Sequence, residues 1–61
     1  MYKVTNISKF PVIIDTFGAN KPENLKQVSA NATEILEISD LRVMELTPLY
    51  TNILKFEQYN G

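Results

Sequence analysis

The sequence predicts a mainly β fold: a small antiparallel sandwich or barrel of four to five strands, with one short helix near residues 40–46. Three observations predict this class. The run Val12–Phe17 is rich in β-branched residues, which favour strands. Apolar and polar residues alternate near both ends of the chain, as in strands with one buried face. Gly18 and Pro22, which break helices, mark a loop between apolar runs.

The first half of the chain is expected to hold three strands. Residues Tyr2–Ile7 read as the first strand, because Tyr2 and Val4 alternate with polar positions. Val12–Phe17 is the second, and its spacing predicts a hairpin with the first strand around residues 6–9. After a loop over residues 18–24, Leu25–Val28 reads as a short third strand.

Residues 32–46 admit two interpretations. A single helix would place most of their apolar residues in one arc but would leave Leu41 and Met44 outside it. Alternatively, a strand over Thr33–Ile38 is followed by a short helix that Ser39 or Asp40 caps. We favour the second interpretation, because the β-branched content is high for an exposed helix.

The predicted helix is expected to stop at Pro48, since proline clashes with the carbonyl four residues earlier. Residues Ile53–Tyr59 then read as the last strand, in which Leu54 and Phe56 alternate with Lys55 and Glu57. The last residues, 60–61, are expected to fray. No linker or repeat divides the sequence, so we expect residues 1–61 to form a single domain.

The composition argues against an enzyme. The sequence contains no His and no Cys, the residues on which general-base, nucleophilic and thiolate–metal chemistry most often depends. We therefore expect no catalytic residue, no metal site, no cofactor and no small-molecule substrate. The residual candidates for acid–base work are the neighbouring carboxylates Glu34, Glu37 and Asp40. A solvated strand and helix face explains these three side chains better, because so small a domain has little room for a cleft.

The charge balance argues against nucleic acid as a partner. The formal net charge is -1, and the Lys and Arg residues are scattered along the sequence. A nucleic-acid binder needs a basic face that neutralises phosphates. No apolar run approaches the roughly 20 residues of a membrane span, so no membrane partner is expected either.

Other protein subunits are the expected partners. A domain of about 60 residues buries only about 60% of its unfolded surface, and the 61 residues here include no cysteine for a disulfide. Stability is therefore expected to come from a homo-oligomer or from docking on a larger assembly. An exposed strand edge within residues 30–40 is one possible route to such an assembly.

The aromatic residues divide into core and interface candidates. Phe17 and Phe56 are expected to fill the core. Four others are the candidate interface residues, because tyrosine and phenylalanine bury large areas at protein contacts: Tyr2, Phe10, Tyr50 and Tyr59. Core edge and interface are equally good interpretations for the three tyrosines.

The sequence resembles the small β-rich structural proteins of tailed bacteriophages. The resemblance is carried by Val4-Thr5-Asn6-Ile7-Ser8 followed by Pro11-Val12-Ile13-Ile14, and by the later Val28–Ile35 segment. It implies a virion component, in the capsid, the head–tail connection or the tail, located in the virion and present in many copies. The alternative is a small phage or bacterial inhibitor or regulator that binds one target protein, located in the cytoplasm.

Overall fold

The computed structural model describes residues 1–60 and contains five strands and one α-helix, in the order β1, β2, β3, β4, α1, β5. The strand bounds are Tyr2–Asn6, Val12–Asp15, Leu25–Val28, Thr33–Leu36 and Leu54–Gln58. Helix α1 spans Asp40–Leu49, and a short 3-10 helix, η1, spans Pro22–Asn24. The prediction of a mainly β fold with four to five antiparallel strands and one short helix is confirmed. The expected fraying of Gly61 lies outside the described residues.

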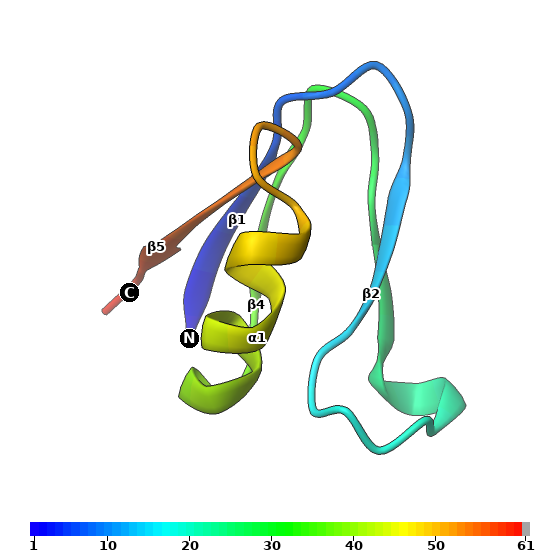
Figure 1. Ribbon diagram of the computed structural model, residues 1–61, viewed down its shortest axis with the longest axis vertical. Coiled ribbons are helices and arrows are strands. Elements are labelled where there is room, and N and C mark those ends of the chain that lie inside the picture. The colour runs from blue at the N-terminus through cyan, green and yellow to red at the C-terminus, as the bar shows by residue number, and fades with distance from the viewer. Residues whose placement is uncertain (61) are drawn as a thin grey trace.

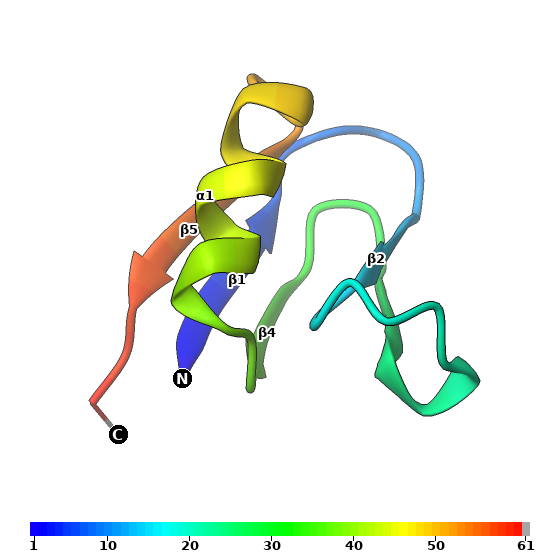
Figure 2. The same ribbon diagram turned by 60° about the horizontal axis from the view of Figure 1, so that its bottom comes forward.

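The strands form two antiparallel sheets. Sheet A has the order β4-β1-β5, so the first strand of the chain is its centre, and sheet B consists of β2 and β3. Helix α1 lies in front of sheet A, and sheet B stands beside them both (Figures 1 and 2). The strand-then-helix interpretation of residues 32–46 is therefore correct, and the single-helix alternative is wrong.

The two sheets are halves of one long, bent hairpin. β2 pairs with β3 next to the loop, and β1 pairs with β4 further along the same two chain segments. Both segments cross from one sheet to the other at the same place, which is the top of Figure 1. The predicted hairpin around residues 6–9 is thus wrong. β1 and β2 do not pair with each other, and the turn that joins two paired strands lies in the loop after β2, where the Thr16 N–H donates to the Asn24 carbonyl.

The side chain of Asn6 explains why residues 6–9 carry the chain from sheet A to sheet B without pairing β1 with β2. Asn6 is fully buried, and its Nδ2 donates to the carbonyls of Phe10 (2.7 Å) and Val28 (2.9 Å). Its Oδ1 accepts from the backbone N–H (2.9 Å) and the hydroxyl (2.6 Å) of Ser8. These bonds join β1 to both segments that cross the bend. The polar groups of this buried amide are all satisfied.

The core lies between the two sheets and α1. Its buried apolar residues come from every layer: Val4, Ile14, Val28, Ile38, Leu46 and Leu54. Phe56 packs against this cluster, as predicted. Phe17 does not, and 47% of it is exposed. The alternation of the strand explains the error: Ile14 and Thr16 point inward, which turns Phe17 outward.

Helix α1 continues past Pro48, contrary to the prediction. Ser39 caps its start by accepting from the Arg42 N–H (3.1 Å), and Tyr50 closes its end by donating to the Leu46 carbonyl. Pro48 lies in the last turn, where it removes only the donor for the Met44 carbonyl. Pro48 and Met44 are both exposed, so that carbonyl lies where solvent can replace the missing donor.

We predict that Asn6→Ala and Asn6→Asp each lower the free energy of unfolding by about 3 kcal/mol. Alanine leaves the partners of the amide unpaired, whereas aspartate directs a carboxylate at two carbonyl oxygens. The loss is a large part of the roughly 3–9 kcal/mol expected for a chain of this length. Urea denaturation measures it. Asn31→Asp, the same chemical change at an exposed turn residue, is the matched control and should change stability little. Equal effects at the two positions would contradict the role of Asn6.

Candidate functional site

The four predicted interface residues lie at opposite ends of the molecule. Tyr2 and Tyr59 are at the end of sheet A where β1 begins, and the Tyr59 N–H donates to the Met1 carbonyl. Tyr50 and Phe10 lie beyond the other end of β1, after α1 and in the bend. The structure therefore does not gather these residues into one site.

The same four residues also differ in exposure. Tyr2 and Tyr50 are half-buried and pack against the core. The Tyr2 hydroxyl donates to Asp40 Oδ1 (2.6 Å), and this hydrogen bond raises the pKa of Tyr2. Phe10 is 74% exposed and Tyr59 is 40% exposed. Among the four, Phe10 and Tyr59 are thus the side chains most accessible to a partner.

The carboxylate candidates are not assembled into a site. Asp40 accepts the Tyr2 hydroxyl, and Glu34 faces Val4 across the β1–β4 pair. Within residues 1–60 there is no cluster of three or more acidic side chains that could hold a metal ion, and no pocket. Both findings are consistent with the solvated-face interpretation of Glu34, Glu37 and Asp40.

Helix α1 carries an exposed apolar surface that the sequence analysis missed. We call it the α1 stripe, and it consists of Leu41, Met44, Pro48 and Leu49. Leu41, Met44 and Leu49 are 67%, 71% and 70% exposed. Val43, Leu46 and Tyr50 cover the core from the opposite side of the helix. A helix that is apolar on both sides is ordinarily covered on both sides.

A sequence signal for the α1 stripe was present. Leu41 and Met44 are three residues apart and fall outside the arc of buried residues, which places them together on the outer face. Once the helix is fixed at residues 40–49, Pro48 joins them four residues after Met44.

Sheet B carries a second exposed apolar surface. We call it the β2–β3 surface, and it consists of Ile7, Phe10, Ile13, Phe17 and Leu25. Ile13, Phe17 and Leu25 are 59%, 47% and 49% exposed, on the side of sheet B opposite the core residues Ile14 and Val28. Ile7 and Phe10 extend the surface into the bend. These five residues are among the eleven exposed large apolar residues of the described chain.

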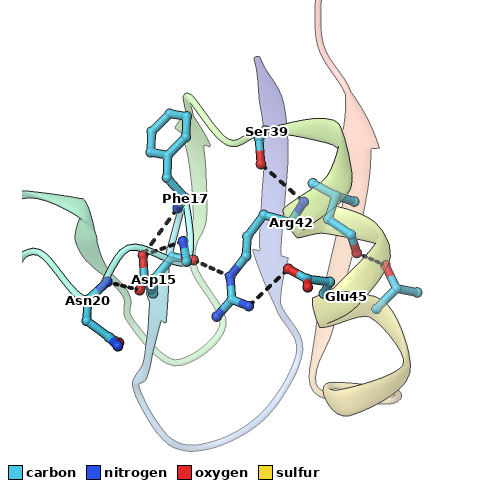
Figure 3. A network of polar contacts seen from close by, with 9 residues as sticks. Asp15, Phe17, Asn20, Ser39, Arg42 and Glu45 are labelled. Carbon is cyan, nitrogen blue, oxygen red and sulfur yellow. Dashed lines mark hydrogen bonds and ion pairs between the residues drawn. The ribbon is translucent and has the colours of Figure 1, made fainter.

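A polar network fixes α1 against sheet B (Figure 3). Arg42 Nε donates to the Asp15 carbonyl (2.7 Å), and Arg42 Nη1 lies 3.3 Å from Glu45 Oε1. The Ser39 N–H donates to the Thr16 carbonyl. These contacts hold the outer edge of β2 to the start of α1, so the positions of the α1 stripe and the β2–β3 surface are fixed relative to each other.

The Asp15 carboxylate shapes the loop that follows β2. It accepts from the backbone N–H groups of Phe17 (3.2 Å), Gly18 (2.8 Å) and Asn20 (3.0 Å). The bond from Asn20 is the largest cause of a lowered pKa at Asp15. Gly18 has φ +72°, in the left-handed region that favours glycine, and its backbone packs beside the Arg42 side chain.

No protein-family model, no curated protein and no solved structure matches this sequence. Within residues 1–60, no helix has the length and hydrophobicity of a membrane span, since α1 has ten residues.

We predict that Asp15→Asn makes the stability of the fold depend less on pH in the acidic range. The folded-state pKa of Asp15 is lowered from the ordinary 3.8, so the carboxylate stabilises the fold above that pH. The contribution is lost as the pH falls below about 4 toward the folded pKa. Thermal unfolding between pH 6 and pH 2 measures it, with Glu23→Gln on the exposed η1 as the control. Parallel curves for the wild type and Asp15→Asn would contradict the prediction.

Proposed function

We propose that this protein is a non-enzymatic structural protein that assembles with other protein subunits, as a component of a bacteriophage virion. The observation that carries the proposal is the imbalance between buried and exposed apolar side chains. Within residues 1–60, six apolar residues are buried, whereas eleven large apolar residues are exposed. Eight of these eleven belong to the α1 stripe and the β2–β3 surface.

Scattered exposed apolar side chains are normal, but contiguous ones indicate contact surfaces. The α1 stripe occupies consecutive turns of one helix, and the β2–β3 surface occupies one side of one sheet and the adjoining bend. Burying either surface against a partner would add apolar area to a core of only six residues. The contacts would therefore stabilise the subunit as well as the assembly.

The virion component of the proposal rests on the resemblance in the Val4–Ser8 and Pro11–Ile14 segments. It agrees with the physical argument, because a capsid or tail repeats one subunit many times. Repetition turns individually weak contacts into a stable shell or ring.

The test is the distribution of the protein in a density gradient of lysate from infected cells. We expect the protein to sediment with virions at a fixed copy number for each particle. Recovery at the top of the gradient, in complex with one host protein, would overturn the proposal and support the inhibitor alternative.

A matched set of variants makes this test specific to the exposed surfaces. Phe10→Ser and Leu49→Gln each remove an apolar side chain that is at least 70% exposed, one from each surface. We expect either change to lower the amount of protein on particles about tenfold. Ile35→Thr, on the outer face of sheet A, is the control and should leave incorporation unchanged. Equal incorporation of all three variants would contradict a role for these surfaces.

A further inference from the structure

We propose that the α1 stripe of one copy packs on the β2–β3 surface of a second copy. This inference rests on the proposed function and deepens it by naming the partner as the same chain. Each surface is half of a helix-on-sheet layer, the arrangement by which helices and sheets ordinarily cover their apolar faces.

Sheet B lacks a layer on its outer side. It has only two strands, and the core covers only the face that carries Ile14 and Val28. A two-stranded sheet is marginally stable without packing on its faces. The exposed face presents Ile13, Phe17 and Leu25, which form an apolar platform for a helix.

The side of helix α1 that is opposite its core contacts is not covered by another element within residues 1–60. Leu41 and Met44 are among the most exposed large apolar side chains of the described chain, and Leu49 extends the stripe to the end of the helix. The stripe lies on the side of α1 opposite Val43, Leu46 and Tyr50, which cover the core, and α1 itself lies in front of sheet A in Figure 1. It cannot reach the outer face of sheet B in the same copy, because the Arg42–Asp15 and Ser39–Thr16 bonds hold α1 against the edge of β2.

The charges beside the two surfaces are complementary. Acidic residues border the α1 stripe, namely Glu37, Asp40 and Glu45, and the guanidinium of Arg42 is already engaged by Asp15 and Glu45. Two lysines flank the β2–β3 surface, Lys9 in the bend and Lys21 in the loop, and Glu23 on η1 is the acidic residue beside them. The Asp15 carboxylate nearby is occupied by backbone N–H groups. Charge therefore favours a contact between the α1 stripe of one copy and the β2–β3 surface of another. It disfavours a contact between two stripes or between two β2–β3 surfaces.

The area available allows both surfaces to be used at once. A standard interface covers about 800 Å² on each partner, which is about a fifth of the 4240 Å² surface of this chain. One copy can donate its stripe to one neighbour and its sheet to another. Such a head-to-tail contact generates a closed ring or an open filament, according to the rotation between copies.

Sedimentation velocity across a wide concentration range tests the proposal on the wild type and two double variants. The stripe variant, Leu41→Gln with Met44→Gln, replaces two apolar side chains by glutamine, which is a good helix former. The sheet variant, Ile13→Thr with Leu25→Thr, replaces two apolar side chains by threonine, which favours strands. We expect the wild type to associate, and each double variant to associate at least about tenfold more weakly. Ile35→Thr, at an exposed site outside both surfaces, should associate like the wild type.

Mixing the two double variants is the decisive step. The stripe variant keeps an intact sheet, and the sheet variant keeps an intact stripe, so the mixture should form a one-to-one dimer that grows no further. Added salt should weaken the contact, because the flanking charges are exposed. Misfolded chains would not restore a defined dimer on mixing, so the result does not depend on the fold of either variant alone.

A wild type that remains monomeric up to millimolar concentration would overturn the inference, while incorporation into virions would still be tested by the gradient. Association of both variants at wild-type strength would show that other surfaces join the copies, and would overturn the inference but not the structural role. A mixture that forms no dimer would also overturn it.

Discussion

The buried side-chain amide of Asn6 is the interaction on which this fold depends. The segment β1–β2 and the segment β3–β4 together form one long hairpin. If this hairpin stayed straight, one face of every strand would lie in solvent. The bend lets the two halves of the hairpin close on a common core. At a bend the ladder of backbone hydrogen bonds is interrupted, and Asn6 replaces the missing bonds with its own donors and acceptor. No apolar residue could do so, because the groups at the bend are themselves polar and buried.

The bend also explains why so much apolar surface remains exposed. It divides a short chain into a three-stranded and a two-stranded sheet, and the single ten-residue helix can cover the facing sides only. Sheet B therefore keeps an uncovered outer side, and α1 keeps an uncovered outer stripe. In a larger domain, further helices would complete these layers. The described residues supply no further helix or strand for these layers, so in the proposed assembly neighbouring subunits would supply them.

Local patterns were sufficient to predict the strands and the helix, because alternation, β-branched runs and loop residues are local signals. Their pairing was not predictable in the same way. The wrong hairpin followed from treating residues 6–9 as a turn, when the decisive bond runs from Asn6 to Val28, far away in sequence. Phe17 was wrongly assigned to the core because the β-branched run does not show which alternate residues of the strand point inward. For the candidate site, residue type directed attention to the tyrosines. Leu41 and Met44 were marked in the sequence only by their place outside the apolar arc, and the exposure of Ile13 becomes visible only when the buried face of β2 is known.

The position of β1 at the centre of sheet A has a consequence for biosynthesis. The ribosome makes this strand well before one of its two partners, β5, at residues 54–58. Until those residues emerge, Val4 and its neighbours have a free edge on one side, and the pairing that closes sheet A joins the two ends of the chain. Such long-range pairing slows folding and extends the time for which a strand edge is exposed. We therefore expect sheet A to close only after residues 54–58 have emerged, at a stage when other newly made copies are already close by.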